Sequence, residues 1–334
     1  MQLDLRLSDL KEIPESVFRA ERVTSLNLEF NEISEIPDRI VEMQGLEELL
    51  LGYNRIREIN PLVFQLPKLR RLRLSRNCLD GVMKCVEFGA GPDIELDVSH
   101  NQLDGFAGFA GSPRLVSLNA CYNRLADLGS GLFADSPRLE VLHLGNNKLS
   151  LIPMGIFGAG GLQYLSLPYN SLQAIHSEPP ELSKLRVLHA QGNRLRAIPC
   201  GMEMLEELIA HENRFSQFPD CSAGVQLRHV DLTCNQIECI PDWLRRHAAL
   251  YWLILSRNRI ECLPDFLLQA QHLQYLSLAD NPLKQIPSVA ELGSMLQFQK
   301  DKPRPVKLRI DLQGHSLPQT NELGAYSPFF DVCA

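Results

Sequence analysis

The sequence predicts a repeat solenoid of the α/β class: a horseshoe with a parallel β-sheet on its concave face and short helices, 3-10 turns or loops on its convex face. Three observations predict it. One leucine-rich pattern recurs along most of the chain, an asparagine keeps a fixed place in that pattern, and a proline often follows six residues later. Each unit of such an array packs only on its neighbours, so 334 residues can share one continuous core. Hydrophobic residues make up 45% of the chain, which is enough to fill it.

The recurring pattern is L-x-x-L-x-L-x-x-N-x-L, with clear copies at 46–56, 139–149 and 250–260. Its leucines alternate along a short strand and point to one side of a parallel sheet that gains one strand per repeat. The asparagine side chain can bond backbone groups of adjacent turns that would otherwise be buried without partners. We therefore expect leucine-rich repeats in which the following asparagines are structural: Asn31, Asn54, Asn77, Asn101, Asn123, Asn147, Asn170, Asn193, Asn213, Asn235, Asn258 and Asn281.

Prolines and phenylalanines predict the convex side. Proline cannot donate to a strand ladder, so it marks the place where the chain leaves the sheet. Apolar residues about ten positions after an asparagine, namely Phe64, Phe133 and Phe157, are expected to fill the core from the convex side. The prolines six residues after an asparagine are Pro37, Pro153, Pro199, Pro219, Pro241, Pro264 and Pro287.

The pattern sets domain boundaries. Residues 1–300 are predicted to form an array of about 13 repeats, 301–317 a degenerate terminal repeat or cap with His315 in the asparagine position, and 318–334 a tail. After Asn77 and Asn101 the proline is missing, and residues 105–113 are rich in glycine. These two repeats are expected to be distorted, or to carry a partner-binding loop.

Composition bears on partners and compartment. The net charge of −7 argues against nucleic acid as a partner, because phosphate binding needs clustered positive charge. No apolar stretch approaches the length of a membrane helix, so direct membrane insertion is not expected. The nine cysteines show no CxxC pair, and no asparagine lies in a glycosylation sequon. We expect a cytoplasmic protein, with nuclear or membrane-recruited pools as alternatives, whose cysteines are small buried hydrophobes.

The positions between the buried leucines predict a binding face. Tyrosine, tryptophan and arginine are favoured anchors of protein interfaces. The alternatives are ordinary surface variation and ring stacking that only supports the sheet. The candidate partner-binding residues on this concave face are Phe30, Tyr53, Arg73, Arg76, His100, Tyr122, His143, Tyr164, Tyr169, His189, His211, His229, Trp252, Arg257 and Tyr275.

Other chemistry on this face is disfavoured. The histidines have no fixed ligand spacing, so a polar binding surface is preferred to a metal site, and no cofactor is expected. The basic patch of Arg71, Arg73 and Arg76 faces acidic residues on adjacent repeats, which favours ion pairs over phosphate recognition. No phosphate loop, nucleophile elbow, zinc-binding helix motif or dinucleotide fingerprint is present, so we predict no catalytic site in this chain.

Five segments carry a closer resemblance. Residues 95–103, 117–125, 209–219, 230–237 and 279–301 resemble the late repeats of the PH-domain leucine-rich-repeat protein phosphatases (PHLPP), including the irregular IAHENRFSQFP. The resemblance implies a cytosolic, membrane-recruited signalling protein whose PP2C-type serine/threonine phosphatase domain acts on AGC kinases such as Akt. Residues 301–334 contain no paired metal-binding aspartates, so no catalytic residue is carried over.

The predicted function is therefore a scaffold that binds a signalling partner, such as a kinase or an adaptor, on its concave face. It would be the substrate-targeting repeat region of such a phosphatase, a short isoform of one, or a separate repeat protein of shared ancestry. One alternative is a free-standing intracellular adaptor of Ras/MAPK-type signalling. A third hypothesis, hydrolase activity of the chain itself, is the least favoured.

Overall fold

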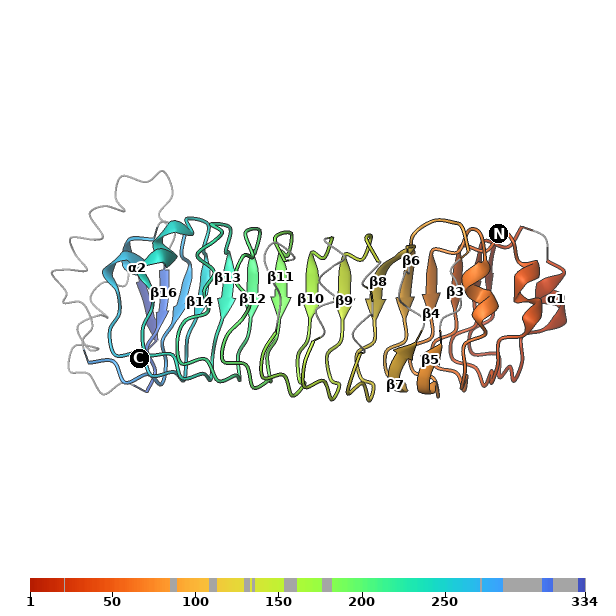
Figure 1. The fold of residues 1–334 in the computed structure, drawn as a ribbon, viewed down its shortest axis with the longest axis horizontal. Coiled ribbons are helices and arrows are strands. Elements are labelled where there is room, and N and C mark those ends of the chain that lie inside the picture. Colours follow the sequence, from red (N-terminus) through yellow and green to blue (C-terminus); the bar gives the residue numbers. More distant parts are fainter. Residues whose placement is uncertain are drawn as a thin grey trace. The chain divides into compact units, whose positions relative to one another are not determined.

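The predicted solenoid with its parallel sheet is confirmed in the computed structural model, which describes all residues except 21, 85–88, 108–112, 129–132, 134–135, 153–160, 176–181, 271, 285–307, 315–329 and 334. The chain divides into a first unit, Met1–Leu172, and a second unit, Gln173–Ala334. Within each unit, every regular repeat adds one short parallel strand beside the strand of the previous repeat (Figure 1).

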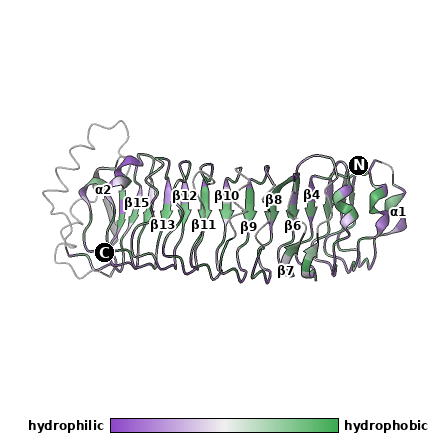
Figure 2. Ribbon diagram, viewed as in Figure 1, coloured by the Kyte–Doolittle hydropathy of each residue, from purple (hydrophilic) through white to green (hydrophobic). Residues whose placement is uncertain are grey.

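The first unit builds its sheet from three- to five-residue strands in strict sequence order. The central residue of a three-residue strand is buried and its two neighbours are more exposed, as in β2, β3 and β9. Figure 2 shows strands β8, β9 and β10 as mainly hydrophobic. The strands are β1 (Gln2–Asp4), β2 (Ser25–Asn27), β3 (Glu48–Leu50), β4 (Arg71–Arg73), β6 (Ile94–Asp97), β8 (Leu115–Asn119), β9 (Val141–His143) and β10 (Tyr164–Ser166).

The second unit repeats the same plan. Strand β16 falls within the predicted terminal repeat at 301–317 and pairs in parallel with β15, while β17 falls within the predicted tail and pairs with β16. His315 and most of both predicted segments lie outside the described residues. The strands are β11 (Val187–His189), β12 (Glu207–Ile209), β13 (His229–Asp231), β14 (Trp252–Ile254), β15 (Tyr275–Ser277), β16 (Leu308–Asp311) and β17 (Phe330–Cys333).

Short helices follow three of the prolines that mark where the chain leaves the sheet. Pro37, Pro241 and Pro264 immediately precede a helix, and an aspartate follows each of them in the first turn. Phe64 and Phe133 are fully buried, as expected, whereas Phe157, Pro153 and Pro287 lie outside the described residues. The helices are α1 (Glu15–Phe18), η1 (Asp38–Glu42), η2 (Pro61–Gln65), η4 (Asp242–Arg246) and α2 (Asp265–Gln269).

The two irregular repeats form a second, two-stranded parallel sheet. Strand β5 (Asp80–Lys84) pairs with β7 (Gln102–Ala107), and the register shifts between Gly81 and Val82. Gly81 has a φ of +67°, a backbone conformation that favours glycine. Where the proline is missing, the chain therefore continues as an extended strand. Residues 108–112 of the glycine-rich stretch lie outside the described residues.

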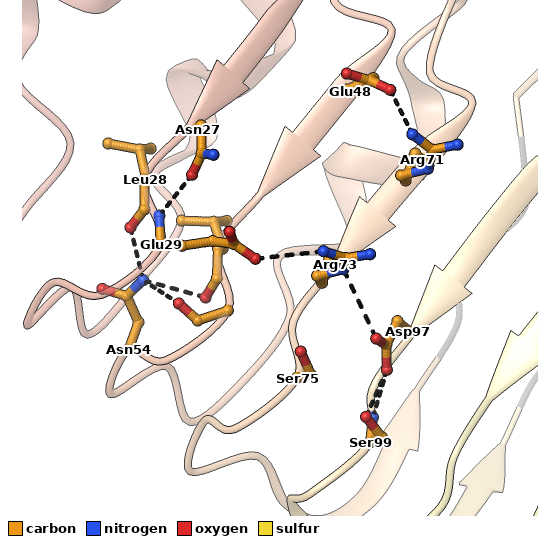
Figure 3. Close-up of polar contacts among 12 residues, drawn as sticks. Asn27, Leu28, Glu29, Glu48, Asn54, Arg71, Arg73, Ser75, Asp97 and Ser99 are labelled. Atoms are coloured by element: carbon orange, nitrogen blue, oxygen red, sulfur yellow. Dashed lines mark hydrogen bonds and ion pairs between the residues drawn. The ribbon is translucent and has the colours of Figure 1, made fainter. Parts of the chain in front are cut away.

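Asparagine side chains bond successive repeats to one another. The Asn54 Nδ2 donates to the carbonyls of Leu28 in the previous repeat, at 2.9 Å, and Leu51 in its own, at 3.1 Å (Figure 3). The Asn54 Oδ1 accepts the backbone N–H of Ile33 at 2.9 Å. Asn147 in the first unit and Asn258 in the second make the equivalent bonds. The predicted structural role of the asparagines is confirmed.

A buried arginine ties the irregular region together, and sequence reasoning missed it. Arg114 is only 4% exposed. Its guanidinium donates to the carbonyls of Pro92 at 2.8 Å, Gly89 at 2.9 Å and Leu69 at 3.0 Å. Burial lowers the pKa of Arg114. The carbonyl oxygens take the place of the water molecules that the guanidinium loses when it is buried.

The prediction that the cysteines are buried is wrong at three positions. Cys200, Cys239 and Cys262 are exposed, whereas Cys221 is buried. Burial raises the pKa of the Cys221 thiol to about 12. The exposed cysteines lie in the segments after the asparagines, where side chains alternate between core and solvent.

Among the described residues, no helix is long and apolar enough to cross a membrane.

Candidate protein-binding face

The residue before each ladder asparagine has a left-handed backbone. Tyr53 and Tyr122, for example, have φ values of 56° and 57°. This region is disfavoured for residues with a β-carbon, most of all bulky ones. Only Gly192 among these positions is a glycine, so the backbone conformation does not explain why rings occupy several of them. The positions are Phe30, Tyr53, Arg76, His100, Tyr122, Asn146, Tyr169, Gly192, Glu212, Cys234, Arg257 and Asp280.

In the first unit, five of these side chains form a ring column, which consists of Phe30, Tyr53, Arg76, His100 and Tyr122. Phe30 stacks on Tyr53 with centroids 4.2 Å apart, and the Arg76 guanidinium lies 5.2 Å from the Tyr53 ring. His100 stacks on Tyr122, also at 4.2 Å and nearly coplanar at 8°. Each of these rings therefore has at least one face covered by a neighbour, although Phe30, Tyr53 and Tyr122 stay 44–50% exposed.

Ion pairs flank the ring column, as the sequence predicts. Arg71 contacts Glu48 at 2.6 Å and Glu95 at 3.1 Å. Arg73 lies between Asp97, at 3.8 Å, and Glu29, at 3.7 Å, which the sequence analysis missed (Figure 3).

Gly52 leaves room for the Glu29 side chain to reach Arg73. A β-carbon at Gly52 would stand 3.0 Å from the Glu29 Oε1 and 3.3 Å from the Ser75 Oγ. The small residue between the two partners therefore lets Glu29 extend past the intervening repeat toward Arg73.

Three further candidates of the first unit lie outside the ring column. His143 and Tyr164, on β9 and β10, pack against each other at 4.8 Å with tilted rings. Tyr169 is 48% exposed, and among the residues that the structure describes it stacks on no other ring. Tyr169 thus resembles the members of the ring column in exposure but lacks their ring contacts.

The second unit carries a ring cluster of different geometry, defined by His189, Glu207, His229, Trp252 and Tyr275. The Glu207 carboxylate lies between two imidazoles, 2.6 Å from the His189 Nε2 and 3.9 Å from the His229 Nδ1. Trp252 meets His229 edge-on at 5.3 Å and 83°, and Tyr275 at 6.1 Å and 60°. Edge-on contacts leave more of a ring face open than stacking does, and Trp252 remains 43% exposed.

The remaining two candidates of the second unit lie apart from the ring cluster. His211 is 3.7 Å from Glu212. Arg257 pairs with Asp280 at 3.4 Å and is exposed. The pKa of Arg257 is raised by hydrogen bonds to Cys234 and Asp280. Both side chains are therefore engaged in local pairs.

The last residue of several strands has a local structural role that sequence reasoning missed. The Asp97 carboxylate accepts the backbone N–H of Ser99, two residues later, at 3.0 Å. This bond closes an Asx turn where the strand ends. The sequence carries a signal for this turn, because an aspartate or asparagine recurs at this position. Equivalent bonds are made by Asn27, Asn119, Asp231 and Asp311.

Electrostatics on this face is modest. The pKa of His100 is lowered, first by burial beneath its stacked neighbour and then by the positive charge of Arg76. Burial raises the pKa of the Cys121 thiol to about 11. Within the described ranges, no group of three or more His, Cys, Asp or Glu side chains is arranged to hold a metal ion. The face presents rings, amides and paired charges.

Comparisons with known proteins agree with the fold. The family Leucine rich repeat matches residues 113–172 and 137–195. A leucine-rich-repeat protein of Leptospira interrogans superimposes with a TM-score of 0.71 at 22% identity, covering 99% of this chain and 95% of that one. An internalin of Listeria monocytogenes has a TM-score of 0.67 at 19% identity, covering 93% and 81%. These likenesses show the fold.

Two further comparisons concern proteins with named roles. The ectodomain of the Arabidopsis thaliana receptor kinase GASSHO1/SCHENGEN3, solved in complex with CASPARIAN STRIP INTEGRITY FACTOR 2, has a TM-score of 0.64 at 25% identity and covers 90% of this chain and 41% of that one. The human PH domain leucine-rich repeat-containing protein phosphatase 1 is 32% identical over 80 residues, which is 23% of this chain and 5% of that protein. The chain is a leucine-rich-repeat protein with a distant, partial similarity to the repeat region of the PH-domain leucine-rich-repeat protein phosphatases.

Proposed function

We propose that the chain is a protein-binding scaffold that contacts its partner with the exposed face of its sheet. The observation that carries the proposal is that large rings stay at the surface of a sheet whose central strand leucines are almost wholly buried. Tyr122, Tyr169 and Trp252 are each more than two-fifths exposed, beside core leucines at 0–2%. Rings of this kind are the residues that anchor protein interfaces. Leucine-rich-repeat solenoids are typically non-catalytic, and the proposal requires no chemistry.

The finer proposal is that this region targets a PP2C-type phosphatase to an AGC kinase such as Akt. The 80-residue similarity to a PH-domain leucine-rich-repeat phosphatase supports it. The matched segment spans only 5% of that protein, so the kinase partner is inferred from relatedness. An edge-on ring cluster beside a carboxylate and two imidazoles suits a mixed apolar and polar protein surface.

Calorimetric titration of the purified chain with the Akt kinase domain tests the proposal. We expect binding that Trp252→Ala combined with Tyr275→Ala weakens by about tenfold or more, the loss typical of interface anchors. The matched control is Val225→Ala, because Val225 is also 43% exposed and lies outside the strands of the same unit. Equal affinity of all three proteins would remove the ring cluster from the interface, and no binding would refute the kinase as partner.

A further inference from the structure

Two exposed cysteines occupy the same position in consecutive repeats. Cys239 follows Asn235 by four residues, and Cys262 follows Asn258 by four. The two repeats are fixed to each other close to these positions. The Ile237 N–H donates to the Asn258 Oδ1 at 3.0 Å, and the Arg259 N–H donates to the Ile237 carbonyl at 2.8 Å. The cysteines therefore occupy equivalent positions of consecutive repeats, whose strands lie about 4.8 Å apart in a parallel sheet.

Both thiols face the same space. Cys239 and Cys262 are exposed and line one surface pocket of about 600 Å³ together with Arg259 and Pro282. The spacing of adjacent repeats falls within the range of about 4.4–6.8 Å between Cα atoms that a disulfide spans. Common register and a common pocket give two thiols that can reach each other.

An ion pair lies beside Cys262. The Lys284 ammonium pairs with Glu261 at 2.5 Å beside Cys262. The pKa of Lys284 is raised, first by its hydrogen bond to Glu261 and in smaller part by the charge of Cys262. The thiolate is the attacking species in thiol–disulfide exchange.

We propose that Cys239 and Cys262 form a dithiol site that closes reversibly to an intramolecular disulfide when it meets a low-molecular-weight disulfide such as oxidised glutathione. One thiolate attacks the small disulfide, forming a mixed disulfide and releasing one small thiol. The second cysteine then attacks the protein sulfur of that mixed disulfide and releases the second small thiol. The protein loses two electrons and two protons, and the small disulfide is reduced to two thiols.

Another cysteine pair in the same unit shows why register matters. Cys200 follows Asn193 by seven residues, whereas Cys221 follows Asn213 by eight. The offset of one residue turns their side chains to opposite sides, so Cys200 is exposed and Cys221 is buried. Cys200 therefore serves as an exposed control thiol without a neighbour in register.

A dithiol-bridging arsenical and a glutathione redox buffer test the site separately. We expect the intact chain to bind phenylarsine oxide through both sulfurs. Cys239→Ser and Cys262→Ser should each weaken this binding about a hundredfold or more, the gain that a second, intramolecular bond confers. In the redox buffer, peptide mapping should find a Cys239–Cys262 disulfide in the intact chain and, in either serine variant, a glutathione adduct on the remaining cysteine of the pair.

The control variant Cys200→Ser should keep the arsenical affinity of the intact chain and should form the same Cys239–Cys262 disulfide. All three serine replacements are at exposed positions, so the fold is expected to survive, and circular dichroism checks this. Arsenical binding that is equal in the intact chain and in the Cys239→Ser variant overturns the juxtaposition. Separate glutathione adducts on Cys239 and Cys262 of the intact chain, without the disulfide, overturn the closure.

Discussion

The ring column of the first unit and the ring cluster of the second are built on the same backbone but use their aromatic residues differently. In the ring column, Phe30 lies flat on Tyr53 and His100 lies flat on Tyr122, so each of these rings has one face covered by its stacking partner. In the ring cluster, Trp252 meets its neighbours edge-on and keeps its face available. Residue type is therefore insufficient to identify a binding anchor, because the position within the repeat decides how a ring is oriented.

The largest expected effect tests whether the supporting backbone is the same in both regions. Two substitutions each remove a carboxamide that bonds two repeats: Asn54→Ala in the first unit and Asn235→Ala in the second. Each variant leaves a buried N–H and buried carbonyls short of a partner, so we expect each to lose about 3 kcal/mol of unfolding free energy. Urea denaturation measures the loss, with Ser150→Ala, at an exposed position, as the control.

Similar losses would confirm that the two faces differ only in their side chains. A loss near 3 kcal/mol for one asparagine and near zero for the other would show that the repeats are held together differently in the two regions.

The second expected effect is that acid lowers the stability of the second unit more than that of the first. His247 of the second unit is 4% exposed, and its Nδ1 accepts the Leu227 N–H at 3.2 Å. Burial lowers the pKa of His247 to about 4 from an ordinary 6.5. The native state therefore favours the neutral ring, and its stability is complete above pH 6.5 and is lost as the pH falls toward 4. We expect a loss of about 3 kcal/mol across that interval.

His247→Gln keeps an acceptor for the Leu227 N–H but does not titrate. The pH dependence of its stability between 6.5 and 4, measured by denaturant unfolding, should be shallower by the same amount. Hydrogen exchange should show the intact second unit opening before the first as the pH falls. Identical pH profiles for both proteins would show that the buried imidazole is not the acid-sensitive group.

The third effect is on binding. Trp252→Ala should weaken binding of the partner by about 2 kcal/mol, because it removes a ring that meets its neighbours edge-on, whereas Tyr122→Ala should cost less, because His100 covers one face of Tyr122. Calorimetric titration of the two variants with the same partner gives the ratio directly. A larger loss at Tyr122 would move the interface to the first unit and reverse the roles of the two regions.

The structure also shows which features a sequence of this kind makes predictable. The roles of the leucines, the asparagines and the prolines that end the sheet were predictable, because each answers a local requirement of the regular repeats. The second sheet of β5 and β7 was not, because it depends on two irregular repeats lying next to each other. The Arg114 bonds were also missed, since they join carbonyls that lie far from it in the sequence.

The binding face was only partly predictable, for a related reason. Periodicity identifies which residues point out of the sheet but not whether neighbouring rings stack flat or meet edge-on. That choice depends on the side chain one repeat away, as with Arg76 over Tyr53. The exposed Cys239 and Cys262 were missed because a preference for burial averaged over cysteines ignores the side of the chain on which each one falls.

The smallest expected effect is on stability, and it separates stacked from open rings directly. Tyr53→Ala removes the contact with Phe30 and the cation–π contact with Arg76, so we expect a loss of about 1 kcal/mol beyond the area term. Tyr169→Ala is the matched control, because Tyr169 has nearly the same φ, 54° against 56°, and nearly the same exposure. Both substitutions keep a β-carbon in the left-handed region, so the backbone strain cancels in the comparison. Denaturant unfolding should therefore find Tyr53→Ala less stable than Tyr169→Ala, and equal stabilities would mean that stacking in the ring column contributes nothing and that its rings are retained for binding.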